Sequence, residues 1–348
     1  MRTTLLGRNL ALLGTIALTA IGAVACGTDD GAGGAGSSGE SVTWYTPMPE
    51  EPARRLAEAF ERESGIEVKV LRQSAGELLA RLKAEAGNPA ADVVGLASGD
   101  TGPLAEENLI RSYESDAADD IDDRFVDPDG YWHANELILI MMGVHADRWE
   151  QETGGAPIPQ TWDELLIPEL SGEVVMPNPT LSGTGYTFVA TQIFRHDGDD
   201  DAAWAYLDGF NDLVGQYTDS GGAPSQLVAT GEYLAGVSFA HDLLNVRDAG
   251  FPIELVYPSP TGLVIAGNAL VEDAPNPEGG EEFIEWLQGR DASQMIVDLV
   301  RSYPVRDDVD LPEGAMNLTD LDLVDYDPVR AGDMREDVSA EYADRYGI

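Results

Sequence analysis

The chain has 348 residues, more than one domain usually contains, so its length favours two domains or lobes. Its 20 lysines and arginines stand against 63 aspartates and glutamates, which gives a formal net charge of −43. Nucleic-acid binding depends on cationic contacts to phosphates, so this balance argues against a nucleic-acid partner, and equally against an anionic membrane surface. The single cysteine excludes a disulfide framework within the chain.

The amino terminus has the pattern of an export signal. Arg2 and Arg8 precede an apolar run over residues 10–24 that is too short and too often interrupted by Gly and Thr to span a membrane comfortably. The run closes on Ala-Val-Ala-Cys-Gly, which resembles the lipobox of bacterial lipoproteins, with Cys26 as the lipidated residue. An ordinary signal peptide with a chance cysteine is the alternative. We expect residues 1–25 to be a lipoprotein signal peptide and the protein to be exported and held at the outer face of the cell membrane by a lipid anchor only.

Folding signals begin after a Gly/Ser-rich stretch. Residues 26–41 have a composition that cannot bury surface, so we expect a flexible tether. Strands are then predicted over 42–46, 66–71 and 92–96, separated by a helix between Pro49 and Gly65 and a helix over 75–86. This alternation indicates a parallel, doubly wound sheet. Ligands on such sheets bind beyond the carboxyl ends of the strands, where this chain has Thr46 and Ser98.

A second α/β pattern follows an apolar run over 137–144. The elements expected there are strands over 173–176, 234–238 and 253–257 and helices over 162–166, 186–195 and 201–213. The chain then returns with a strand over 262–271, helices over 279–288 and 292–300, and an acidic, loop-rich tail. We therefore expect lobe 1 to begin with residues 42–144, lobe 2 to comprise 145–258, and residues 259–348 to return to lobe 1 and supply the C-terminal helices. Two interleaved lobes of this kind enclose a cleft.

Four segments carry a family resemblance. In chain order they are VTWYTPMPEEPARRLAEAFERESGIEVKVL, PAADVVGL, MPNPTLSGTGYTFVATQ and GGAPSQLVATGEYLAGVSFAHD. They resemble the extracellular solute-binding proteins of ABC importers, in the branch that includes iron(III), phosphonate, sugar-phosphate and thiamine receptors. The resemblance implies a type II periplasmic-binding-protein fold, α/β, with two doubly wound lobes, a hinge and an interlobe cleft. It also implies no catalytic activity, no cofactor, a monomer, and a permease and an ATPase as partners.

Two turns are candidates for an anion site. Residues 179–185 and 220–225 each place small hydroxyl residues and glycines before a helix, so unpaired amides and hydroxyls can point at one oxyanion. Each turn alone is more typical of a plain helix cap, which is the commoner use of Ser, Thr and Gly there. The family uses both places for ligand, and this favours binding. The candidate residues, with the two loops of lobe 1 that they are expected to face, are Ser182, Gly183, Thr184, Ser220, Gly222, Ala223, Thr46 and Ser98.

His241 and Asp242 follow the strand predicted over 234–238, where the iron-binding relatives carry two adjacent tyrosines that ligate the metal. Because both tyrosines are missing, we expect no metal site. The pair resembles the organic-phosphate branch instead, where it would bond ligand hydroxyls or an amine. A helix-capping aspartate beside a surface histidine is the alternative.

An enzyme is the second class of function to weigh. Residues 236–240 faintly imitate a nucleophile elbow, but that fold needs its histidine well downstream of the serine, and the last histidine lies three residues after Ser238. We expect no catalytic residues. The function predicted is the lipid-anchored substrate-binding component of an ABC importer that captures a small anionic solute, an organic phosphate or phosphonate, by cleft closure. The alternatives are an iron(III) or thiamine receptor of the same family and a surface lipoprotein without a transport role.

Overall fold

The computed structural model describes residues 41–197 and 199–348. The predicted signal peptide, the predicted lipidation site Cys26 and the tether up to residue 40 lie outside the described residues. Among the described residues, no helix is both long and apolar enough to cross a bilayer.

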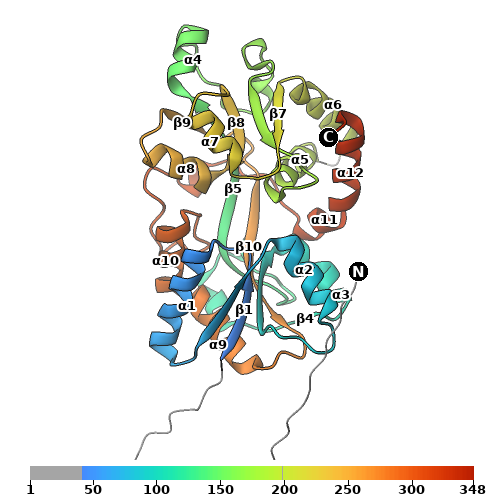
Figure 1. The fold of residues 1–348 in the computed structure, drawn as a ribbon, viewed down its shortest axis with the longest axis vertical. Helices are drawn as coiled ribbons and strands as arrows, with labels where there is room; N and C mark the ends of the chain where they lie inside the picture. The colour runs from blue at the N-terminus through green and yellow to red at the C-terminus, as the bar shows by residue number, and fades with distance from the viewer. Residues whose placement is uncertain (1–40, 198) are drawn as a thin grey trace, which may run out of the picture. The chain divides into compact units, whose positions relative to one another are not determined.

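Strands of both orientations form one curled mixed sheet in the described part of the chain (Figure 1). Its order is β2-β1-β3-β10-β5-β8-β6-β7, with β4 paired to β10 and β9 paired to β5. The strands are β1 (Val42–Thr46), β2 (Val68–Arg72), β3 (Val93–Ala97), β4 (Ile110–Arg111), β5 (His133–His145), β6 (Val174–Pro177), β7 (Val214–Thr218), β8 (Ala235–Phe239), β9 (Ile253–Val256) and β10 (Leu263–Val271).

Helices cover both parts of this sheet. Those described are α1 (Glu50–Ser64), α2 (Ala75–Ala84), α3 (Thr101–Glu106), α4 (Ala146–Thr153), α5 (Gly183–Phe194), α6 (Asp200–Asn211), α7 (Ala223–Ala229), α8 (Ala240–Asp248), α9 (Pro277–Gln288), α10 (Arg290–Val300), α11 (Pro328–Asp333) and α12 (Arg335–Tyr346). Their ends follow local chemistry. Gly65, at a φ of 80°, ends α1, and Ser74 with Glu77 forms a capping box at the start of α2.

The long strand β5 belongs to two sets of strands. Its first half pairs with β10, which in turn pairs with β3 and β4, and its second half pairs with β8 and β9. We call the part around β1 to β4 and β10 lobe 1, and the part around β6 to β9 lobe 2. Each lobe has its own core: Trp44, Leu56 and Phe283 are buried together in lobe 1, and Trp162 and Phe188 in lobe 2.

The parallel pairing expected for the first three strands is confirmed, since β1 pairs in parallel with both β2 and β3. One local prediction is wrong, and one strand was not predicted. The helix predicted over 162–166 is a single 3-10 turn at Asp163–Leu165. The predicted helix over 201–213 ends at Asn211, and the chain continues directly into β7, which the sequence analysis missed because this edge strand is only partly buried and lacks a continuous apolar run.

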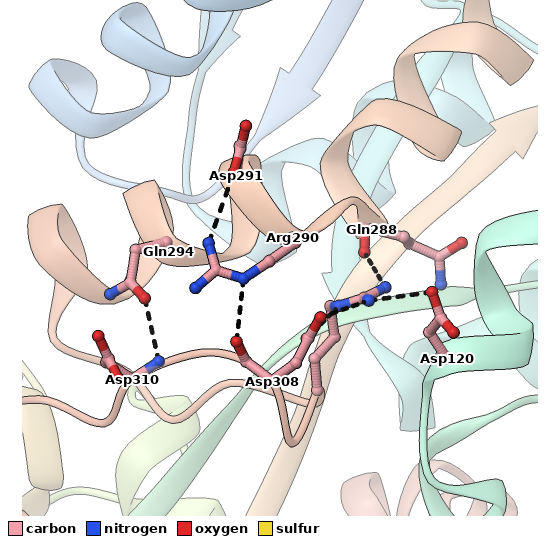
Figure 2. Close-up of polar contacts among 8 residues, drawn as sticks. Asp120, Gln288, Arg290, Asp291, Gln294, Asp308 and Asp310 are labelled. Carbon is pink, nitrogen blue, oxygen red and sulfur yellow. Dashed lines mark hydrogen bonds and ion pairs between the residues drawn. The ribbon is translucent and has the colours of Figure 1, made fainter.

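A buried arginine holds the acidic segment that follows α10, the segment that carries Asp308 and Asp310 in Figure 2. The Arg306 side chain is 7% exposed, and its guanidinium donates to Asp308 at 2.8 Å and to Asp120 at 3.0 Å. Nearby, the Arg290 Nε donates to the backbone oxygen of Asp308 at 3.1 Å. Hydrogen bonding to Arg306 holds the pKa of the Asp308 carboxyl below its usual range. This segment therefore depends on one buried cation.

We predict that Arg306→Gln lowers the free energy of unfolding by about 1–3 kcal/mol at pH 7, because the charge-assisted hydrogen bonds are lost while both aspartates keep access to water. Because the pKa of Asp308 is lower in the folded state, its contribution is present above its unfolded pKa of about 3.9 and disappears as the pH falls through the folded value. The difference between wild type and variant should therefore shrink below about pH 4.

Urea unfolding at pH 7 and at pH 3 measures both effects. Arg290→Gln is the matched control, since the Arg290 side chain is 52% exposed and should cost less. An equal loss in the two variants, or a gap that does not depend on pH, would contradict the assignment.

Candidate functional site

A cavity of about 360 Å³ lies where the two lobes meet. Lobe 1 contributes residues of β1, β3 and β10, lobe 2 contributes residues of α5, β8 and α8, and α11 and α12 complete the wall. Much of the wall is apolar, with Trp44, Met48, Ile138, Phe239 and Val264 on it. An apolar wall with a few polar groups is typical of a small-molecule site.

The amino terminus of α5 opens on this cavity at Gly183. Its cap residue, Ser182, makes no side-chain hydrogen bond to the helix, and the first amides of a helix have no partner within the helix. Gly185 allows the end of α5 to pack closely against the end of β6, because an added Cβ there would lie 2.4 Å from the carbonyl oxygen of Pro177. The helix thus presents uncapped amides and the positive end of its dipole to the cavity.

Arg335, at the start of α12, reaches the cavity wall beside this helix end. Its Nη2 atom lies 3.9 Å from the point where a Cβ of Gly183 would stand. Its Nη1 atom donates to the Asp100 carboxylate at 3.1 Å, and its guanidinium lies over the Tyr186 ring, 5.1 Å from the centroid. Burial raises the pKa of Asp100, and Arg335 offsets part of this shift. Two positive poles, a guanidinium and a helix terminus, therefore meet at one corner of the cavity.

Comparison with known proteins places the chain in a family. The sequence profile described as bacterial extracellular solute-binding protein matches residues 55–319. The chain belongs to this family. The resemblance to extracellular solute-binding proteins of ABC importers, seen in the sequence, is confirmed.

Individual relatives agree with this assignment. The solute-binding protein is 32% identical over 243 residues to an uncharacterized protein of Haemophilus influenzae. This match covers 68% of this chain and 69% of the relative. It is 28% identical over 265 residues to a Salmonella paratyphi A periplasmic protein whose name assigns it 2-aminoethylphosphonate binding, covering 72% and 73% of the two chains.

Solved structures confirm the type II periplasmic-binding-protein fold. The periplasmic binding protein AfuA of Actinobacillus pleuropneumoniae, solved with fructose 6-phosphate, superposes with a TM-score of 0.79 at 27% identity and covers 90% of this chain and 100% of its own. Iron-bound HitA of Pseudomonas aeruginosa superposes with a TM-score of 0.77 at 18% identity, covering 87% and 99% of the two chains. The latter likeness shows the fold alone.

The predicted ligand residues of this solute-binding protein fall into two groups. Thr46, Gly183 and His241 lie on the cavity wall, and Ser98, which is buried, directly precedes the wall residue Gly99. The remaining candidates lie outside the wall: Ser182, Thr184, Ser220, Gly222, Ala223 and Asp242.

The turn that precedes α7 packs behind the end of α5 instead of lining the cavity. A Cβ added to Gly221 would lie 2.1 Å from Thr184 Oγ1 and 3.1 Å from Ser182 Oγ. Ser238 Oγ donates to the Gly221 carbonyl at 2.9 Å, and the Asp242 carboxylate lies against Gly222. The two predicted turns are therefore brought together, but as a support for the cavity corner, with Gly183 alone reaching the wall.

Several wall residues were missed by the sequence analysis. Asp100 and Arg335 are more than 200 positions apart in the chain, so no local pattern joins them. Glu136 carried a signal that was overlooked, since it is an acidic residue at the head of the apolar run LILIMM. The described residues contain no group of three His, Cys, Asp or Glu side chains arranged to hold a metal ion.

We predict that Gly221→Ala destabilises the protein by about 1–3 kcal/mol, because the new methyl must displace Thr184 and with it the first turn of α5. Urea unfolding measures the loss. Gly102→Ala is the control, since an added Cβ there meets nothing within 4 Å. Equal stability of the two variants would show that the turns do not support each other.

Proposed function

We propose that this protein is the lipid-anchored substrate-binding component of an ABC importer and that it captures a small organic phosphate or phosphonate by closure of its cleft. The observation that carries the proposal is the corner where Arg335 stands beside the uncapped end of α5. A guanidinium offers donors in the geometry of an oxyanion, and a helix end offers amides and a favourable dipole. Phosphate and phosphonate groups match both.

The relatives support the same class of solute. One is named for 2-aminoethylphosphonate binding, and the structure of another was solved with fructose 6-phosphate. Both solutes end in a dianionic group with three oxygens. Under this proposal that shared group lies at the Arg335 corner, and the variable part of the solute extends along the apolar wall toward Phe239 and His241.

The net charge of −43 does not prevent anion capture. Fields from exposed carboxylates decay over about 10 Å at 0.1 M salt, whereas a guanidinium and helix amides act at contact distance. Local geometry therefore decides whether the potential in the cavity favours an anion. The net charge of the whole chain acts mainly on the rate at which protein and anion meet at low ionic strength.

Iron(III) is less well served by this cavity, although relatives include an iron uptake protein at 25% identity. Tyr186 and Tyr326 lie on the wall, but burial raises the pKa of both phenols, that of Tyr326 to about 12, which opposes the phenolate form that iron needs. The Tyr186 hydroxyl also donates to the Ala331 carbonyl. An iron(III) receptor is therefore the less favoured alternative, and a thiamine receptor is the other alternative.

We predict that Arg335→Gln weakens binding of both 2-aminoethylphosphonate and fructose 6-phosphate by about 1.5–3 kcal/mol, or 10- to 150-fold, because both solutes share the oxyanion held there. Isothermal titration calorimetry gives the affinities. Arg345→Gln is the control, since its side chain is also 39% exposed but pairs with Glu341 on the surface of α12.

Unchanged affinities in Arg335→Gln would place the anion elsewhere. If the wild type binds neither solute, titration with Fe(III) and with thiamine tests the alternative receptors. Binding of none of the four would favour a surface lipoprotein without a transport role.

We predict that Cys26→Ser releases the protein into the soluble extracytoplasmic fraction, because the substitution removes the thiol that would carry the lipid. The measurement is fractionation of cells expressing wild type or variant, followed by detection with an antibody. A wild type that is already soluble would contradict the lipid anchor without touching the proposed solute.

A further inference from the structure

A buried carboxyl on the cavity wall lies outside the anion corner and has no role there. Glu136, on β5, is 8% exposed, and its Oε2 atom has no hydrogen-bond partner among the described residues. Ser302 lies close enough to lower the pKa of Glu136, but neither the Ser302 hydroxyl nor Glu136 Oε2 has a hydrogen-bond partner with full geometry among the described residues. A buried carboxyl without a partner is costly, and such a group calls for an explanation.

Glu136 faces the cavity in regular alternation with Ile138, and a sheet irregularity beside it brings a second polar side chain to the same wall. Between β5 and β10 the register shifts, so that Ala266 lies opposite Glu136 while Gly267 lies opposite Ala134. Asn135 is therefore the extra residue of a β-bulge, and both Asn135 and Glu136 line the cavity. Bulges commonly re-aim side chains next to binding sites.

The neighbours of Glu136 leave room for a ligand. In the sheet, Ala266 lies between Glu136 and Ala97, so the residues beside the carboxyl are small. The nearby His241 ring is also buried at Nδ1, without a partner in the described residues, and lies on the same wall. Two wall residues, Glu136 and His241, thus each carry a buried polar atom without a partner among the described residues.

We propose that Glu136 binds the cationic end of the solute, so that the solute is a zwitterion with an ammonium group as well as a phosphonate or phosphate. This inference rests on the proposed function, because it assigns the second end of the same ligand. An ammonium group supplies the hydrogen bonds and the charge that a buried carboxylate lacks. It also explains why a cavity for an anion contains two carboxyls, Asp100 paired with Arg335 and Glu136 unpaired.

Burial raises the pKa of Glu136, and the nearby Ser302 and His241 lower it only in part. This shift disfavours the charged carboxylate, and an ammonium group beside it would oppose the shift. A neutral acid could otherwise donate to the phosphonate oxygens, and the experiment has to separate these two roles.

The test compares two probes that differ only in the amine, 2-aminoethylphosphonate and ethylphosphonate, by isothermal titration calorimetry on the full chain. We expect wild type to prefer the aminophosphonate, and Glu136→Gln to weaken binding of that probe by about 10- to 150-fold while leaving ethylphosphonate nearly unchanged. The retained ethylphosphonate affinity also shows that the variant is folded. Glu254→Gln, an exposed carboxylate on β9, is the matched control.

Three results would overturn the inference: equal affinity of wild type for the two probes, unchanged affinity of Glu136→Gln for both, or an equal loss for both. The second indicates a neutral acid that Gln replaces, and the third a residue that only shapes the cavity. Fructose 6-phosphate is the third probe, and a loss in Glu136→Gln as large as that of the aminophosphonate would assign hydroxyl binding instead. Failure of wild type to bind any of the three would defeat the proposed function itself.

Discussion

The strand β5 has to satisfy backbone partners in two lobes at once, and the cavity lies where those partners change. Its first half pairs with β10 and its second half with β8 and β9. Because the strand is continuous, its first half contributes to lobe 1 and its second half to lobe 2, and side chains of its first half also line the cavity. The bulge at Asn135 lies in the first half of the strand, and it adds Asn135 to the cavity wall beside Glu136, which faces the cavity in regular alternation with Ile138.

The electrostatics of the cavity follow from burial more than from the composition of the chain. Most of its acidic residues are surrounded by water, where each is screened within about a Debye length. The acidic and basic side chains that line the cavity are few: Arg335, Asp100, Glu136 and His241. Arg335 and the amides of α5 make one corner positive, although Asp100 offsets part of the guanidinium charge, and the unpaired Glu136 adds an acidic group to the same cavity.

Much of the fold could be predicted from the sequence, since the strands and helices of lobe 1 begin and end at strong local signals. VTWYT has the apolar and β-branched content of a buried strand, and Gly65 ends the helix after it. The edge strand β7 lacks such a signal. The site was predicted only in part: the turn at Gly183 follows from small residues before a helix, whereas the approach of Arg335 depends on how α12 packs, which no local pattern records.

The carboxyl-terminal helices join the two lobes a second time. The Gly332 backbone in α11 approaches Gly99 of lobe 1 so closely that an added Cβ would lie 1.9 Å from the Gly99 oxygen, while Tyr342 in α12 is buried in the core of lobe 2. Separation of the lobes must therefore break this contact as well as bend the connecting strands. Because this contact needs no solute, it adds a cost to separation of the lobes that does not depend on the ligand. A solute that holds the lobes together then has less free energy to supply, by the amount that this contact already contributes.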